Sequence, residues 1–311
     1  MSTLRTYAQL CRLPAVFTAM ADVFLGYSLT HHDLRPAHVF GRLLFASSAI
    51  YLAGMVLNDY FDRDVDAIER PQRPIPSGRV SATTARWLGI TLLTIGILAG
   101  VGPSWNSQIV VMLLATAVLL YDGGLKKTFM GPVVMGSCRM LNVLLGASAV
   151  PGSLAMVFAP PQAIIAVALG LYVAGVTWFA KKEAEQSGRA GLIFGQAVMN
   201  AGLLLLATWM TPQLRPLWFG WQFHMLDGEA WRPLAMLGVI AVIVNRRAIA
   251  AILNPSPAQV QSAVRVMLLS IITIDATLIY AALGDPGVPI AAGVVALLVP
   301  SFILGKWMTM T

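Results

Sequence analysis

The sequence predicts an all-α membrane protein, a polytopic bundle of nine to ten transmembrane helices. Of its 311 residues, 57% are hydrophobic and only 11% are charged, whereas an ordinary soluble domain carries roughly 25% charged residues. Almost the whole chain divides into apolar segments of about 20 residues, each long enough to cross a hydrocarbon core of about 30 Å. Because no linker long enough to separate two soluble domains interrupts these segments, we expect one membrane domain over residues 1–311.

Ten apolar segments are candidate spans. They run from about Pro14 to Thr30, Leu43 to Phe61, Thr84 to Val101, Gln108 to Tyr121, Gly131 to Val150, Gln162 to Phe179, Leu192 to Met210, Pro233 to Val244, Val266 to Leu283 and Val288 to Leu304. The segment that begins at Pro233 is short unless it extends through Asn245 and the two arginines that follow, so a count of nine also remains open.

The positive charges predict the orientation of the chain. With ten spans, 16 of the 21 Lys and Arg residues fall on the side of the two termini, and four fall on the opposite side. Short connections rich in Lys and Arg remain in the cytoplasm. We therefore expect both termini to be cytoplasmic, in a bacterial-type inner (plasma) membrane.

Several other functions find no support in the residues. The net charge of +7 comes from basic residues at the edges of the spans, which favours contact with anionic membrane lipid and gives no basic block for a nucleic acid. The two cysteines, Cys11 and Cys138, make neither a disulfide framework nor a metal-ligand spacing. The chain has neither a Walker-type phosphate loop nor a GxSxG element.

The most informative stretch is "LNDYFDRDVDAIERPQRPIPSGRVS", Leu57 to Ser81. Its aspartates Asp59, Asp62 and Asp66 lie three and four residues apart, so they can line one side of a helix that continues beyond the apolar run. Carboxylates that cluster at the C-terminal end of a helix repel one another and the helix dipole. Magnesium, which binds carboxylates and substrate phosphate oxygens, is the simplest compensating cation.

The arginines that follow indicate a phosphate site. Arg70, Arg73 and Arg79 stand among three prolines and Gly78, which predicts a turned, stiff loop. Guanidinium groups on such a loop can bind phosphate through two parallel hydrogen bonds. Metal-binding acids and arginines at a membrane surface point to a substrate with a diphosphate head and a lipid tail. A solvated loop that follows the positive-inside rule is the simpler alternative, but that rule does not account for the aspartates.

These motifs resemble the UbiA superfamily of intramembrane prenyltransferases. "NDYFDRDVD" fits that family's NDxxDxxxD motif, "RPQRPIPSG" is similar to its RPxRPIPSG loop, and "YDGGLKKT" is similar to its later tyrosine and lysine segment. The resemblance implies a helical bundle around a lipid-accessible cavity, in which two acidic motifs hold Mg²⁺ and a prenyl diphosphate. It also implies transfer of the prenyl group to an acceptor that the residues do not identify.

The candidate site residues follow from these motifs and from matching positions elsewhere. The expected catalytic residues are Asp59, Asp62 and Asp66, and the expected metal ligands are Asn58, Asp59, Asp62, Asp66 and Glu185. The expected diphosphate contacts are Asn58, Arg70, Arg73, Tyr121, Lys126, Lys127, Arg139 and Lys182. Arg139 lies inside a span, as do Asp22 and Asp275. Each of the three either faces the cavity or makes a polar contact between helices.

The second acidic motif departs from the family pattern, which reads approximately KDxxDxxGD. This chain reads "KKEAEQSGR", with Lys181 in place of the lysine, Lys182 and Glu185 in place of the first two aspartates, and Arg189 in place of the last. Cations in a metal site oppose metal binding by repulsion.

Three explanations of this departure remain open. Lys182 and Arg189 bind the diphosphate in place of a second ion, or they bind an anionic acceptor, or prenyl transfer has been lost. In the last case the protein binds, presents or helps to transport a lipid or prenylated metabolite. "VTWFAKKEAEQSG" and a late segment that begins "NPSPAQVQSAVRV" also resemble the EboC-like branch of the superfamily.

Overall fold

The computed structural model describes residues 3–181, 187–211 and 231–309, and this part of the chain contains helices and no strands. The α-helices are α1 (Thr3–Leu10), α2 (Val16–His31), α3 (Ala37–Phe61), α4 (Arg63–Glu69), α5 (Ala82–Val101), α6 (Trp105–Asp122), α7 (Gly131–Ala147), α8 (Leu154–Val157), α9 (Gln162–Ala180), α10 (Arg189–Met210), α11 (Trp231–Leu253), α12 (Pro257–Leu283), α13 (Val288–Ala296) and α14 (Leu298–Thr309). Three short 3₁₀ turns are η1 (Leu13–Ala15), η2 (Leu125–Lys127) and η4 (Asp285–Gly287). The predicted all-α class is confirmed.

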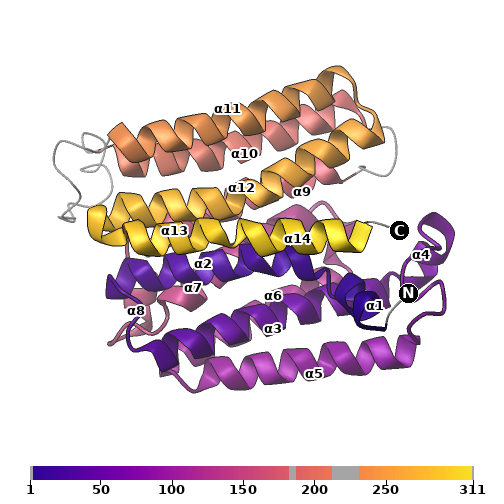
Figure 1. Cartoon of the computed structure of the whole chain (residues 1–311), viewed down its shortest axis with the longest axis horizontal. Helices are drawn as coiled ribbons and strands as arrows, with labels where there is room; N and C mark the ends of the chain where they lie inside the picture. Colours follow the sequence, from indigo (N-terminus) through magenta and orange to yellow (C-terminus); the bar gives the residue numbers. More distant parts are fainter. Residues whose placement is uncertain (1–2, 182–186, 212–230, 310–311) are drawn as a thin grey trace.

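The long helices run side by side through one bundle (Figure 1). Within the described ranges, nine helical segments are long and apolar enough to cross a membrane, and α7 is a tenth apolar helix of 17 residues. At 1.5 Å per residue α7 extends about 26 Å, so it nearly matches the hydrocarbon thickness. Helix α1 and the end of α14 lie at the same end of the bundle as α4 (Figure 1), as an even number of crossings requires.

Helix α11 is longer than the short eighth segment that the sequence predicts. The helix continues through Asn245 and the two arginines to Leu253, and therefore has 23 residues. The amide of Asn245 is satisfied inside the bundle, because its Oδ1 accepts from Gln196 Nε2 and Asn200 Nδ2, both at 2.8 Å. Two polar helix faces that satisfy each other explain how a carboxamide is accommodated in an apolar span.

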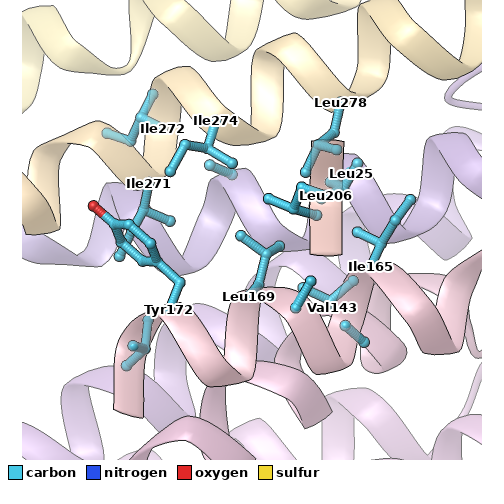
Figure 2. Packing of buried hydrophobic residues seen from close by; sticks show 14 of the residues in the cluster. Leu25, Val143, Ile165, Leu169, Tyr172, Leu206, Ile271, Ile272, Ile274 and Leu278 are labelled. Atoms are coloured by element: carbon cyan, nitrogen blue, oxygen red, sulfur yellow. The ribbon is translucent and has the colours of Figure 1, made fainter. Parts of the chain in front are cut away.

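The core lies between α12, α9, α2 and α7. Figure 2 shows Leu169 and Tyr172 of α9 packed against Ile271 and Ile274 of α12, with Leu25 of α2 beside them. The hydroxyl of Tyr172 donates to the carbonyl of Met267 at 2.9 Å, which satisfies the polar end of a fully buried ring. These contacts make α12 the central element of one half of the bundle.

Small residues allow a close contact between helices α9 and α10. In a membrane the lipid tails are as apolar as the side chains, so helix pairs depend on close packing between backbones. A Cβ added to Gly195 would lie 2.6 Å from the backbone nitrogen of Phe179 and 2.8 Å from the carbonyl oxygen of Gly175. Backbone atoms cannot give way cheaply, so this position accommodates only glycine.

The Gly195→Ala variant is therefore expected to lower the stability of the bundle by about 1–3 kcal/mol, the usual cost of overpacking. The matched control is Gly238→Ala on α11, where an added Cβ would meet nothing within 4 Å. Thermal unfolding of both variants in detergent measures the difference. A Gly195→Ala midpoint equal to that of Gly238→Ala would contradict the proposed close contact.

Candidate active site

The first acidic motif lies where α3 meets α4, at one end of the bundle. Helix α3 ends at Phe61, α4 begins at Arg63, and Asp62 occupies the junction. Helical hydrogen bonding continues across it, since Asp62 N donates to Asn58 O at 3.0 Å and Asp66 N donates to Asp62 O at 2.8 Å. The expected single helix is thus two helices with a bend at Asp62.

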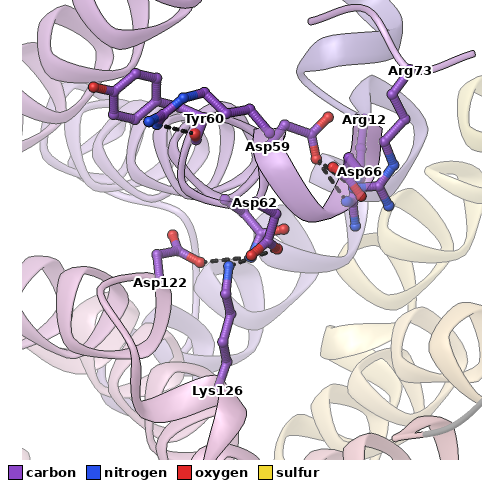
Figure 3. A network of polar contacts seen from close by, with 10 residues as sticks. Arg12, Asp59, Tyr60, Asp62, Asp66, Arg73, Asp122 and Lys126 are labelled. Atoms are coloured by element: carbon purple, nitrogen blue, oxygen red, sulfur yellow. Dashed lines mark hydrogen bonds and ion pairs between the residues drawn. The ribbon is translucent and has the colours of Figure 1, made fainter. Parts of the chain in front are cut away.

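Two of the aspartates are buried and share one arginine. Asp59 and Asp66 are each 4% exposed. Arg73 Nη1 donates to Asp66 Oδ2 at 2.5 Å and to Asp59 Oδ1 at 3.2 Å, as Figure 3 shows. Arg12 Nη2 donates to the same oxygen of Asp59 at 2.9 Å. Arg73 therefore compensates the repulsion that the spacing of these acids predicts, with Arg12 as a second cation.

The loop that carries Arg73 is turned, as its prolines predict. Ser77 N donates to Arg73 O at 3.0 Å, and Val80 N donates to Pro74 O at 3.0 Å. Gly78 has a φ of 73°, a conformation that glycine adopts without strain. Ser81 then caps α5 by accepting from Thr84 N at 3.0 Å. These bonds fix the backbone of the loop and point the guanidinium of Arg73 at the two acids.

The third aspartate pairs with the lysine segment. Lys126 of η2 donates to Asp62 Oδ2 at 2.7 Å, and Figure 3 shows its side chain reaching up from η2 toward Asp62. The amide of Asn58 donates to Asp122 Oδ1 at 2.9 Å, at the end of α6. Two motifs that lie more than 60 residues apart therefore meet at this end of the bundle.

These groups surround a pocket of about 440 Å³. Its lining includes Arg12, Asn58, Asp62, Asp66, Glu69, Arg70, Arg73, Tyr121, Lys126, Lys127 and Lys181. Six of these side chains are cations and three are acids, so the wall carries an excess of positive charge that suits an anionic ligand. Asp59 lies behind the wall and reaches the pocket through Arg12 and Arg73.

Eight of the residues expected at the diphosphate or metal site line this pocket: Asn58, Asp62, Asp66, Arg70, Arg73, Tyr121, Lys126 and Lys127. Lys182 and Glu185, which were also expected there, lie outside the described residues. Their neighbour Lys181, at the end of α9, lines the pocket. This places the beginning of the second motif beside the same pocket as the first.

Arg189 does not lie at the pocket. Its Nη2 donates to the carbonyl of Leu253 at 3.2 Å, so it caps the C-terminal end of α11. A cation at a helix C-terminus is favourable because carbonyl groups there lack partners. The expectation that Arg189 binds the diphosphate is therefore not supported by its position.

Arg139 lies deeper in the bundle and is not part of this pocket. Its Nη1 donates to Asp22 Oδ2 at 2.5 Å and to Thr18 O at 2.9 Å. Asn142 donates to the same oxygen of Asp22 at 2.8 Å. Arg139 also borders a separate cavity of about 70 Å³, which Tyr51 and Cys138 line as well. Arg139 thus pairs between helices and faces the smaller cavity, and the expected contact with a diphosphate in the larger pocket is not supported by its position.

Sequence reasoning missed Arg12 on the wall of the pocket and Asp122 beside the wall, where it accepts from Asn58. Arg12 carries no motif and lies 47 positions from Asp59, so only the packing of the N-terminal segment brings the two together. Asp122 follows the predicted tyrosine directly, and an acid at the end of an apolar span was a signal available in "YDGGLKKT".

A family model described as the UbiA prenyltransferase family matches residues 19–270. The chain belongs to this family. It is an integral, multi-pass membrane protein, as its family membership and the nine apolar helical segments in the described part of the chain show. The predicted resemblance is thereby confirmed.

Individual relatives agree with this membership. The chain is 38% identical over 128 residues to a digeranylgeranylglyceryl phosphate synthase of Ignicoccus hospitalis, which covers 40% of each protein. It is 30% identical over 146 residues to a protein of the same name from Sulfurisphaera tokodaii, which covers 46% of this chain and 52% of that one. The match therefore spans about two fifths to a half of the length of these relatives.

Solved structures show the same fold. A UbiA homolog from Aeropyrum pernix K1 superposes with a TM-score of 0.68 at 18% identity, over 85% of this chain and 96% of the other. A UbiA homolog from Archaeoglobus fulgidus, bound to GPP and Mg²⁺, superposes with a TM-score of 0.59 at 15% identity, over 94% of this chain and 99% of the other. At these identities the likeness establishes the UbiA-like fold alone.

The bridging role of Arg73 can be measured as stability. In Arg73→Gln the buried carboxylate of Asp66 loses its ion-pair partner, so the free energy of unfolding is expected to fall by about 1–3 kcal/mol. The control is Arg63→Gln, because Arg63 pairs with Asp64 on the surface, where the carboxylate is 84% exposed and such pairs contribute little. Equal unfolding midpoints for the two variants in detergent would contradict the bridge.

Proposed function

We propose that this protein is a magnesium-dependent prenyltransferase that ionises a prenyl diphosphate and transfers the prenyl group to an acceptor. The observation that carries the proposal is the cation-rich pocket at the end of the bundle where α3 meets α4, with Asn58, Asp62 and Asp66 on its wall. Such a pocket combines the oxygen donors that magnesium prefers with the cations that a diphosphate needs.

The donor chemistry suits a magnesium ion. Asp62, Asp66 and the amide of Asn58 offer oxygens to the same pocket, and Mg²⁺ typically takes one or two carboxylates together with water and phosphate oxygens. Within the part of the chain that the structure describes, no three His, Cys, Asp or Glu side chains already converge on one metal position. The aspartates are instead paired with cations. When bound, the ion would supply positive charge that polarises the diphosphate as a leaving group.

The protein's own cations have a definite task in this reaction. Lys126, Arg73 and Lys181 border the pocket from three separate elements and would hold oxygens of the diphosphate between them. As the bond between the prenyl carbon and the bridging oxygen ionises, negative charge grows on the departing diphosphate. Preorganised cations stabilise that charge without rearranging, which lowers the barrier. An electron pair of the acceptor then forms the new bond to the allylic carbon, and the proton that the acceptor loses passes to water or to the released diphosphate.

The prenyl chain would extend into the bundle below the diphosphate. The same helices that carry the pocket also border the deeper cavity: α3 through Ile50 and Tyr51, and α6 through Leu114 and Val118. On α3, Tyr51 precedes Asn58 by seven residues, so both lie on one face of the helix. The wall of that cavity offers the apolar side chains of Ile50, Leu114, Val118 and Met135 to a hydrocarbon tail, beside the ion pair of Arg139 and Asp22.

The comparisons support the donor and the metal in this proposal. The matched relatives are named as digeranylgeranylglyceryl phosphate synthases, and the Archaeoglobus fulgidus homolog was solved with GPP and Mg²⁺. The matches to the named relatives are partial, so we leave the acceptor unassigned. The EboC-like branch stays a prediction.

We further propose that the pocket opens to the cytoplasm of a bacterial-type inner membrane. The support is the distribution of charge: Arg70, Arg73 and the two lysines of η2 line the same pocket as Arg12, which directly follows α1. The positive-inside rule places such an end in the cytoplasm.

The alternative is a UbiA-fold protein without transferase activity, which binds, presents or helps to transport a lipid or prenylated metabolite. The observation that favours it is the replacement of two aspartates of the second motif by Lys182 and Arg189. The complete first motif and its ion-paired arginine loop favour the enzyme.

The decisive variant is Asp62→Asn, because Asp62 lines the pocket and pairs with Lys126. We expect it to reduce magnesium-dependent prenyl transfer by at least about 100-fold, as loss of a preorganised electrostatic partner commonly does. The assay incubates the protein in lipid with labelled prenyl diphosphates of several lengths and a membrane extract.

Asp64→Asn is the matched control, since Asp64 lies two residues away with its side chain 84% exposed and only a surface partner. It should keep activity within about twofold of wild type. If wild-type protein binds the prenyl diphosphate but releases no inorganic diphosphate and forms no prenylated product, the alternative function stands. Equal activities for the two variants would place the chemistry elsewhere.

A further inference from the structure

Arg12 holds an unusual backbone conformation at the edge of the pocket. It lies between α1 and η1 with φ 45° and ψ 46°, in the left-handed region that residues other than glycine rarely adopt. Such a conformation persists only where the surrounding structure holds it. From this turn the side chain of Arg12 reaches Asp59 and borders the pocket. The direction of this guanidinium therefore depends on what fixes the turn.

The C-terminal helix α14 contacts the chain on both sides of that turn. After the turn, Ser301 Oγ donates to the carbonyl of Pro14 at 2.8 Å, and Ser301 is only 4% exposed. Before the turn, Gln9 Nε2 donates to the carbonyl of Met308 at 3.3 Å, and the guanidinium of Arg5 lies 5.9 Å from the ring centre of Trp307. Figure 1 shows α14 ending beside α1.

A second support reaches the same segment from the arginine loop. Arg79 Nη1 donates to Gln9 Oε1 at 2.9 Å, so the side chain of Gln9 connects α14 with the loop that carries Arg73. This contact lies before the turn. On the side after the turn, Ser301 of α14 provides a side-chain hydrogen bond from a distant element. Ser301 is thus the point at which α14 fixes the second half of the turn.

We propose that Ser301 is a positioning residue for Arg12, and that α14 thereby sets a guanidinium on the wall of the diphosphate pocket. Ser301 touches neither the pocket nor its acids and acts through the Pro14 carbonyl. The inference assigns a role to a helix that lies beyond residues 19–270, the range that the family model matches. Its kinetic consequence rests on the proposed function, whereas the held turn does not.

Cys11 provides a reporter of the turn that does not depend on activity. It precedes Arg12 and is half-buried, and burial together with the nearby Asp59 raises the pKa of its thiol to about 11. Both effects keep the thiol unreactive at neutral pH, because only the thiolate is a strong nucleophile. In a Cys138→Ser background Cys11 is the only thiol of the chain. Its rate of reaction with a water-soluble maleimide then measures how firmly the turn is held.

We expect Ser301→Ala to raise the rate of Cys11 labelling by about fivefold, the effect of losing one buried neutral hydrogen bond. Ser270→Ala is the matched control, because Ser270 donates to Val266 of its own helix and touches neither α1 nor η1. It should leave the labelling rate unchanged. Unfolding midpoints of both variants in detergent establish that the bundle remains folded.

The kinetic test is a double-mutant cycle. Ser301→Ala should raise the KM for the prenyl diphosphate by about fivefold and change kcat little, because a displaced Arg12 weakens binding of the diphosphate. In an Arg12→Ala background the same substitution should have no further effect, since two residues that act through one contact are not additive.

An unchanged rate of Cys11 labelling in Ser301→Ala would overturn the proposal. A KM change in the double variant equal to the product of the changes in Ser301→Ala and Arg12→Ala would overturn it as well. If wild-type protein transfers no prenyl group but Ser301→Ala still accelerates labelling of Cys11, the held turn stands and the proposed function fails. The two claims are therefore tested separately.

Discussion

The pocket depends on one constraint: two buried carboxylates, Asp59 and Asp66, lie close enough to share a single guanidinium. In a site that excludes most water, two such charges repel each other strongly unless a cation lies between them. Arg73 supplies that cation, and its loop is folded by prolines and backbone hydrogen bonds so that the guanidinium reaches both acids. The bridge therefore connects the arginine loop with α3 and α4 and neutralises two acids beside the pocket.

The same constraint explains how the pocket can take a charged substrate. Its aspartates are already neutralised by Arg12, Arg73 and Lys126. A diphosphate attracts these cations, and a magnesium ion is attracted by the carboxylates. Binding of both would therefore exchange one set of ion pairs for another and leave no buried charge unpaired. Such an exchange costs less than desolvating isolated charges at a membrane surface.

The sequence predicted the parts of the site that are local in the chain. The acids of "NDYFDRDVD" and the arginine loop are adjacent, so helix spacing and proline content indicated their arrangement. Asp62, Asp66, Arg70 and Arg73 line the pocket together with Tyr121 and Lys126. The bend at Asp62 was not predictable from spacing, which is the same in a continuous helix. The predicted spans correspond to helices, and α11 was underestimated because Asn245 interrupts the hydropathy while its partner Asn200 lies on another helix.

Contacts that depend on helix packing escaped sequence reasoning. An ionisable residue within a span indicates a polar partner but not its identity. Arg139 pairs with Asp22, which lies 117 positions away, and does not line the diphosphate pocket. Arg12 could not be predicted for the same reason. Its side chain reaches Asp59 from a turn near the N-terminus that is supported by α14, a helix near the C-terminus.

The most direct test of the central claim is equilibrium binding of a labelled prenyl diphosphate to the purified protein in lipid, with Mg²⁺ and then with a chelator. A prenyl diphosphate pocket predicts saturable binding that unlabelled inorganic diphosphate competes away and that weakens when magnesium is removed. Binding that does not saturate, or that inorganic diphosphate leaves unchanged, would contradict the account.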